Sequence, residues 1–121
     1  MKCPCNTLKL YNDCCKKAHQ NIHSVATAEI LMRSRYSAFV MANIEYLQKS
    51  HHSSTRPSNI EIKEILTWTK SVEWVKLEVL ESSENYVEFK AYFYENGALN
   101  IIQENSFFEK ENNHWVYKNG I

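Results

Sequence analysis

Residues 87–97 read VEFKAYFYENG, and this stretch decides how the second half of the chain folds. Its apolar side chains occupy every second position and are separated by charged residues or tyrosine: Val87, Phe89, Ala91 and Phe93. A period of two is typical of a β-strand with one buried face. Asn96-Gly97 follows, and this pair favours the positive φ angles of a two-residue hairpin turn. The stretch therefore predicts a strand that ends in a tight hairpin.

The alternation continues on both sides of this stretch. Residues 76–79 alternate in the same way before it, and a third strand is expected over residues 99–109 after it. Asn112-Asn113 then turns the chain into a last strand over residues 115–118. Because the strands follow one another with short connections, we expect an antiparallel meander.

The first half of the chain has a helical period instead. Between residues 26 and 41 the apolar side chains recur three or four positions apart, at Ala28, Leu31, Met32, Tyr36, Phe39 and Val40. A short second helix is expected from Ile44 to about residues 50–52. Ser58 and Glu61 fit a capping box that opens a third helix. Helices followed by antiparallel strands predict an α+β domain with its helices on one face of a curved sheet.

The first 22 residues have no periodic apolar pattern, so a metal is the simplest means of ordering them. All four cysteines of the chain lie here, at Cys3, Cys5, Cys14 and Cys15. Four thiolates are enough to close a tetrahedral zinc site with no open position. The alternative is a set of free or redox-active thiols. His19 is the reserve ligand if the adjacent Cys14 and Cys15 cannot both reach the metal.

Charge and hydropathy limit the partners and the cellular location that we expect for this protein. Fourteen basic residues balance fourteen acidic ones, which disfavours non-specific binding to a polyanion, and we expect no sequence-specific DNA binding. No apolar stretch of signal-peptide length follows Lys2, and no run reaches membrane-spanning length. We therefore expect a cytoplasmic protein that does not bind membranes. A reducing compartment favours a metal site over disulfides.

Two motifs resemble known families. Cys3-Pro4-Cys5, Tyr11 and Cys14-Cys15 resemble the SEC-C zinc motif, named for the carboxyl end of the SecA translocation motor. The sequence LMRSRYSAFV at residues 31–40 resembles the signature of the YchJ-like bacterial proteins, and the similarity continues to the end of the chain. Asn6-Thr7 stand where the SEC-C motif usually has Gly-Ser.

This resemblance implies a fold and a division of the chain. It implies a SEC-C zinc module over residues 1–22. A nuclear-transport-factor-2-like domain of the cystatin-like type would follow over residues 23–121, as a cone of helices wrapped by a curved antiparallel sheet. The family supplies no reaction to carry over.

The leading functional hypothesis is a non-enzymatic, zinc-stabilised adaptor, by analogy with the SEC-C module of the translocation motor. Its partner would be a protein or the ribosome. Lys9, Lys16 and Lys17, with Lys2, give the cysteine segment a basic character that suits an acidic protein segment or ribosomal RNA. The outward tyrosines of the sheet are a candidate surface for a homodimer: Tyr86, Tyr92 and Tyr94.

The alternative is a small-molecule binder or an enzyme that uses the interior of the cone. Arg35 falls on the apolar side of the first helix, and Glu104 faces inward from the third strand, so we expect these two charges to pair. Such a pair either fixes the fold or binds a ligand. Tyr36 and His52 complete the candidate pocket, and no residue is assigned a catalytic role. An open pocket with converging polar groups would favour this alternative.

Overall fold

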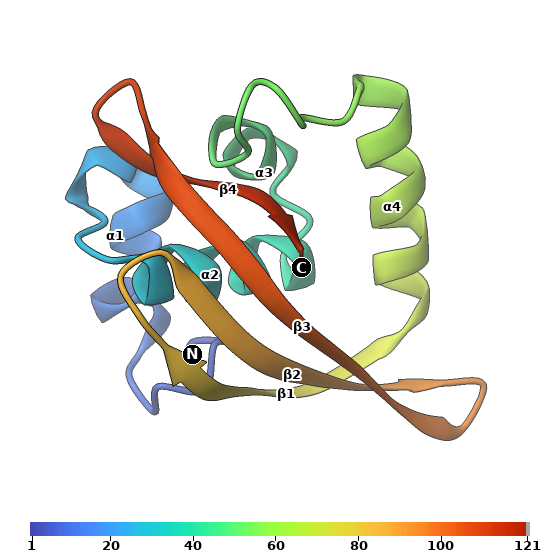
Figure 1. Ribbon diagram of the computed structural model, residues 1–121. Helices are drawn as coiled ribbons and strands as arrows, with labels where there is room; N and C mark the ends of the chain where they lie inside the picture. Colours follow the sequence, from blue (N-terminus) through green and yellow to red (C-terminus); the bar gives the residue numbers. More distant parts are fainter. Residues whose placement is uncertain (121) are drawn as a thin grey trace.

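Four antiparallel strands form one sheet in the order β1-β2-β3-β4 (Figure 1). The computed structural model describes residues 1–120. The strands are β1 (Glu73–Ser82), β2 (Tyr86–Glu95), β3 (Ala98–Glu111) and β4 (His114–Gly120). The predicted meander is therefore confirmed. The two predicted turns are also present, because φ is positive at all four of their residues: Asn96, Gly97, Asn112 and Asn113.

Three helices form the layer next to this sheet. They are α2 (Ala28–Val40), α3 (Ile44–Lys49) and α4 (Asn59–Ser71), of which α2 packs inside the curve of the sheet. α2 begins two residues later than the sequence predicts, because the Thr27 side chain accepts a hydrogen bond from the Ile30 amide and caps the helix there. The predicted capping box opens α4, since the Ser58 hydroxyl accepts from the Glu61 amide at 3.1 Å and the Glu61 carboxylate accepts from the Ser58 amide at 3.0 Å.

The N-terminal segment contains short helices that the sequence pattern did not predict. They are η1 (Tyr11–Asp13), α1 (Cys15–Gln20) and η2 (Ile22–Ser24). Each is too short to produce a helical period. α1 buries Cys15 and Ala18, and η2 buries Ile22. These short helices hold the N-terminal segment against the larger domain.

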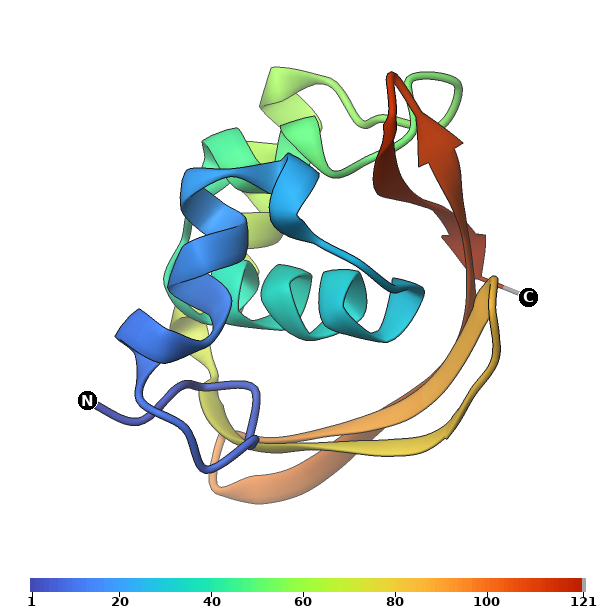
Figure 2. The same ribbon diagram turned by 90° about the vertical axis from the view of Figure 1, so that its left-hand side faces the viewer.

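The sheet curls around α2, and the N-terminal segment runs beside β1 (Figure 2). Register places concave-face residues of neighbouring strands side by side, with Leu77 opposite Ala91 and Ala91 opposite Ile102. The core between helices and sheet includes large, fully buried side chains from both layers: Leu31, Leu47, Val87, Phe108 and Val116.

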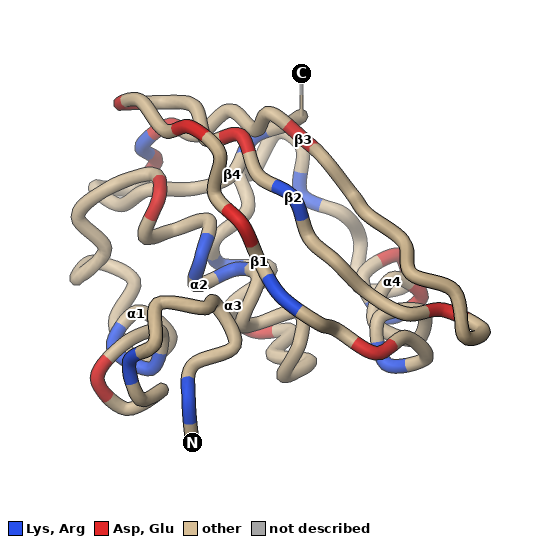
Figure 3. Tube along the Cα trace, turned by 90° about the horizontal axis from the view of Figure 1, so that it is seen from below, with Lys and Arg blue, Asp and Glu red and all other residues tan. Residues whose placement is uncertain are grey.

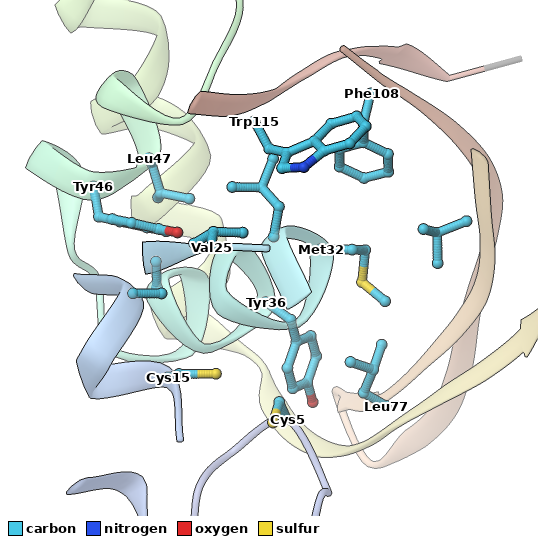
Figure 4. Packing of buried hydrophobic residues seen from close by; sticks show 14 of the residues in the cluster. Cys5, Cys15, Val25, Met32, Tyr36, Tyr46, Leu47, Leu77, Phe108 and Trp115 are labelled. Carbon is cyan, nitrogen blue, oxygen red and sulfur yellow. The ribbon is translucent and has the colours of Figure 1, made fainter. Parts of the chain in front are cut away.

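The cysteines join this core rather than forming a separate one. Cys5 and Cys15 belong to the same cluster of buried side chains as Met32, Tyr36 and Phe108 (Figure 4). The first 22 residues and the larger domain therefore share a packed boundary. The division of the chain at residue 22 remains a prediction.

The convex face of the sheet is partly apolar. Tyr86 and Tyr94 are about two-fifths exposed, whereas the Tyr92 hydroxyl donates to the Glu78 carboxylate at 2.9 Å. A homodimer through this face remains a prediction. Within residues 1–120 no helix combines the length and the apolar character needed to cross a membrane.

Candidate functional site

The four cysteine sulfurs lie in one cluster. Their Sγ atoms are all within 4.8 Å of one another, and those of Cys5 and Cys14 are 3.5 Å apart. A zinc ion bound tetrahedrally at about 2.3 Å from each sulfur requires sulfur–sulfur separations of ~3.8 Å. The thiols are therefore gathered at nearly the spacing that a tetrahedral ion needs. The donor set of four sulfurs also fits zinc chemically.

A tight loop brings the two cysteine pairs together. The Cys3 amide donates to the Lys9 carbonyl at 2.9 Å, and the Tyr11 amide donates to the Met1 carbonyl at 2.9 Å. Between these bonds the chain reverses through a positive φ of 65° at Asn6. Asparagine tolerates this conformation better than most residues, which explains how it can replace the usual glycine of the motif.

Thr7, the second departure from the motif, takes part in the cluster. Its hydroxyl lies 3.1 Å from the Cys14 sulfur and 3.5 Å from the Cys5 sulfur. A hydroxyl is the group that the usual serine would supply. The replacement therefore retains a hydrogen-bonding partner for the sulfurs.

The crowding of the thiols shifts their protonation. A hydrogen bond from Cys15 holds the pKa of the Cys5 thiol near 4, well below its usual value. Sharing its proton with Cys5 raises the pKa of Cys15, and burial raises the pKa of Cys14. Without a metal, a Cys5 thiolate beside protonated Cys14 and Cys15 is therefore favoured. A bound dication would replace the shared protons, which makes metal binding release protons.

His19 does not serve as the reserve ligand. Its Nε2 donates to the Ser34 carbonyl at 2.8 Å, so its Nδ1 accepts from the Tyr11 hydroxyl at 2.7 Å. Its ring also packs on Tyr46, with the ring centroids 4.6 Å apart. Both nitrogens are engaged, and burial lowers the pKa of His19. The residue ties α1 to α2, and it is not needed as a ligand because both adjacent cysteines reach the cluster.

Three contacts dock the cysteine cluster on the larger domain. Arg33 Nη1 of α2 donates to the Cys5 carbonyl at 2.7 Å. The Cys3 sulfur lies 3.5 Å from the Ser37 hydroxyl, one turn farther along the same helix. The Leu77 amide of β1 donates to the Asn6 side chain at 2.8 Å. The cluster is therefore fixed to both a helix and a strand.

A cavity of about 350 Å³ lies between the helices and the concave face of the sheet. Its walls are mostly aromatic or aliphatic and come from α2, α4 and all four strands, including Tyr36, Trp68, Trp74, Phe89, Ala91 and Phe108. Ile65, Trp68 and Ile102 line the cavity and are also 41%, 37% and 38% exposed, so it reaches the surface between α4 and β3. The cone is thus not filled by its own side chains.

Arg35 places a charged group in the wall of this cavity. The residue is only 7% exposed, and its Nη1 donates to the Leu47 carbonyl at 2.9 Å and to the Ser50 hydroxyl at 2.7 Å. Its guanidinium carbon lies 5.0 Å from the centroid of the Tyr117 ring. Burial lowers the pKa of Arg35 to about 10, so the side chain stays charged at neutral pH.

The expected ion pair between Arg35 and Glu104 is not formed. Both residues line the cavity as expected, but no carboxylate of residues 1–120 lies within salt-bridge distance of Arg35. Glu104 instead accepts a hydrogen bond from the Ser106 hydroxyl at 2.5 Å. The reason is that the carbonyl end of α3, at Leu47, holds the guanidinium. Residue spacing along one helix and one strand cannot predict that contact.

The prediction for His52 is also wrong, because its neighbour His51 lines the cavity. The chain here pairs with β4: the Tyr117 amide donates to the Ser50 carbonyl and the His52 amide to the Tyr117 carbonyl, both at 2.8 Å. Successive side chains of an extended segment point to opposite sides. His51 therefore faces inward and His52 outward.

The two histidines have different surroundings. His52 Nε2 lies 3.1 Å from a Glu109 carboxylate oxygen and 3.6 Å from one of Glu111. His51 Nδ1 lies 3.5 Å from Arg35 Nη2, and burial, with Arg35 and Arg56 nearby, lowers the pKa of His51 to about 4. His51 is therefore neutral at physiological pH. From the sequence, His52 rather than His51 was assigned to the pocket, because the strand-like pairing of this loop leaves no periodic pattern.

The lysines of the candidate partner surface lie on the N-terminal module. Lys9 and Lys17 are exposed and Lys16 is half-buried. Figure 3 shows basic residues near the N-terminus and on α1. None of these three forms a salt bridge within the part of the chain that the structure describes. They are free to meet an external partner.

Comparisons with known proteins agree with this architecture. A model of the middle, NTF2-like domain of YchJ matches residues 27–120. A UPF0225 protein of Vibrio parahaemolyticus is 40% identical over 124 residues, which cover 98% of this chain and 73% of that protein. A UPF0225 protein of Corynebacterium glutamicum is 35% identical, and the alignment covers 98% of this chain and 95% of that protein.

Two solved structures have a similar fold. A SEC-C motif containing protein from Rhodopseudomonas palustris matches with a TM-score of 0.84 and 29% identity, over 100% of this chain and 98% of that one. A SEC-C motif containing protein from Psychrobacter arcticus matches with a TM-score of 0.77 and 35% identity, over 97% and 80%. The chain therefore belongs to the family of YchJ-like proteins, with an NTF2-like domain over residues 27–120 and a cysteine motif of the SEC-C type before it.

Proposed function

We propose that this protein binds a small organic ligand in the cavity of its cone, and that a zinc ion held by the four cysteines is a structural part of its frame. The observation that carries the proposal is the cavity itself, with the buried charge of Arg35 in its wall. Protein interiors are usually packed with few voids larger than a water molecule. A cavity of this size with few polar groups in an apolar lining is typical of a ligand site.

The zinc proposal is supported by the donor set. Four clustered sulfurs favour a thiophilic ion, and in a cell zinc is the common ion for a closed site of four cysteines. Such a site leaves no coordination position for water or substrate. The ion would therefore hold the N-terminal segment in place, and any chemistry would belong to the cone.

Ligand binding can be tested with a substitution that fills the cavity. Ala91 is 4% exposed and lines the cavity, so Ala91→Phe should occupy the space that a ligand needs. Ala98→Phe is the matched control, because Ala98 is exposed at the hairpin between β2 and β3. A screen of small aromatic compounds by ligand-observed NMR should give binders to the wild type and the control that the Ala91 variant loses. Equal binding to all three proteins would place the ligand elsewhere.

A second candidate function is the adaptor, supported by the exposed lysines of the N-terminal module. Four lysines and one aspartate lie within residues 1–22, and a zinc ion with four thiolates adds about two negative charges. Much of the basic character therefore balances the metal centre, which makes this the weaker candidate. Partner capture should weaken as salt rises and should be lost when Lys9, Lys16 and Lys17 are replaced by glutamate. Partner capture that is unaffected by salt and by the glutamate substitutions would rule out the adaptor function.

A further inference from the structure

The polar end of the cavity contains two opposite charges that do not touch. Arg35 is almost fully buried and Glu104 is half-buried, and both line the cavity. Tyr117 lies next to both: its ring stacks on the guanidinium, and burial and the Glu104 charge raise the pKa of its hydroxyl. The two charges therefore share one neighbour, Tyr117, and line one cavity.

The guanidinium has hydrogen-bonding capacity left over. Arginine has five N–H donors. Nη1 donates to the Leu47 carbonyl and to the Ser50 hydroxyl, and Nη2 makes one long contact of 3.5 Å with His51. Within residues 1–120 no acceptor is bonded to Nε. These remaining donors lie in the wall of the cavity, where an acceptor from a ligand could meet them.

The carboxylate of Glu104 is held in place and keeps capacity to accept a further hydrogen bond. Its Oε2 accepts from Ser106, which is only 1% exposed. Its Oε1 lies so close to Gly120 that a Cβ at that position would collide with it. The Tyr117 hydroxyl neighbours this carboxylate, which can accept more hydrogen bonds than Ser106 and Tyr117 supply. A donor from a ligand would therefore find a fixed acceptor.

We propose that the ligand carries a zwitterionic head group on an apolar body, as an aromatic or branched α-amino acid does. Its carboxylate would meet Arg35 and its ammonium would meet Glu104, while its side chain would contact the aromatic wall formed by residues such as Trp74 and Phe89. A ligand with a single charge would leave either buried Arg35 or half-buried Glu104 without a partner, which is unfavourable in a largely apolar cavity. This inference rests on the proposed binding function of the cavity.

Four compounds with one phenyl body test the inference: L-phenylalanine, 3-phenylpropionate, phenethylamine and 3-phenylpropionamide. They carry a zwitterionic, an anionic, a cationic and a neutral donor–acceptor head group. Each would be titrated into the full-length protein and followed by calorimetry and by tryptophan fluorescence, since Trp68 and Trp74 line the cavity. L-Phenylalanine should bind at least about tenfold more tightly than each of the others, because a charge-assisted hydrogen bond is lost in each alternative.

Glu104→Gln gives the sharper result. The amide keeps the shape of the side chain and an acceptor for Ser106, so the fold should be retained. The variant should lose L-phenylalanine affinity by about tenfold and should bind 3-phenylpropionate more tightly than the wild type does. Glu109→Gln, on the same strand but beside His52 outside the cavity, is the matched control and should leave the order of the compounds unchanged.

The possible failures are distinguishable. If the amide or either singly charged compound binds as tightly as L-phenylalanine, or if Glu104→Gln leaves the order unchanged, the zwitterion inference is overturned while the cavity remains a binding site. If none of the four compounds and none of the aromatic compounds of the wider screen binds, both the inference and the proposed function are overturned.

Discussion

The N-terminal module and the cone cavity use different faces of the same helix, α2, and are organised by opposite means. On one face, Arg33 and Ser37 contact the cysteine loop. On another, Met32 and Arg35 line the cavity. The module has few apolar side chains and is ordered around four sulfurs, whereas the cavity is a space left between helices and strands that pack on their own.

Because of this difference, different interactions stabilise the two regions. Removing a bound metal would take away the centre of the first region and leave its loop with the few contacts that it makes with α2 and β1. Removing a cavity side chain alters a small part of a large packed domain. We therefore expect loss of a metal-site cysteine to change the free energy of unfolding strongly but only within the module. Substitutions in the cavity wall should change the free energy of unfolding moderately.

The largest effect is expected from loss of the metal. Cys5→Ser removes a ligand that is fully buried, and it should destabilise the N-terminal module by ~4 kcal/mol or more, in the range of lost metal sites. Metal analysis should give about one zinc per wild-type chain and much less in the variant. Thr7→Ser keeps the hydroxyl beside the sulfurs and should retain the metal.

Hydrogen exchange shows whether that effect is local. After chelation, the amides of Cys3 and Tyr11 should exchange rapidly, because their acceptors lie in the cysteine loop. Amides of β2 and β3 should stay protected. Simultaneous loss of protection in the module and in β2 would mean that the two regions unfold as one unit, and the contrast drawn between them would fail.

A moderate effect is expected from the cavity wall. Arg35→Met removes charge-assisted hydrogen bonds to Leu47 and Ser50, and relief from burying a charge offsets part of the loss, so it should destabilise by ~2 kcal/mol. Glu104→Gln keeps its bond to Ser106 and should change stability by less than ~1 kcal/mol.

The double substitution of Arg35 and Glu104 measures the coupling energy between the two side chains. Since the two side chains form no direct ion pair but share Tyr117 as a neighbour, the coupling between the two changes in unfolding free energy should stay below about 1 kcal/mol in urea titrations. A coupling above about 1 kcal/mol would restore the ion pair that the sequence suggested.

The same contrast explains how much of each region could be predicted from the sequence. The four cysteines were identified as a cluster because metal chemistry demands particular residue types, and the capping box of Ser58 and the turn at Asn96-Gly97 were identified because local backbone chemistry does. The orientation of His51, the contact of Arg35 with the end of α3 and the existence of a cavity depend on how separate elements pack. No spacing in the sequence encodes them. The sequence did not predict α1, because six residues are too few to show a helical period.

The stability of the protein should also depend on pH through His51, which lines the cavity. Burial holds the pKa of His51 at about 4 in the folded protein, against about 6.5 when unfolded. The unfolded chain thus binds more protons between these values, so stability should fall as the pH drops from about 6.5 towards 4. His51→Gln should reduce the slope of unfolding free energy against pH above pH 5, where the carboxylates titrate little, and leave the part due to His19, whose pKa burial also lowers. An unchanged profile would mean that the ring is not buried as described.

The last effect is expected at the link between the two regions, and it tests whether the link exists only while the module is ordered. Asn6 accepts from the Leu77 amide and has a φ of 65°. Asn6→Gly keeps the backbone conformation and loses only this hydrogen bond, so it should cost ~1 kcal/mol. Asn6→Ala loses the bond and also strains the backbone, so it should cost ~1 kcal/mol more. After chelation the module is disordered, its loop no longer meets β1, and unfolding of the cone should be the same for wild type and both variants. A difference that persists in the chelated protein would show that the cysteine loop keeps its place on β1 without a metal, and the module would then be ordered by packing, as the cone is.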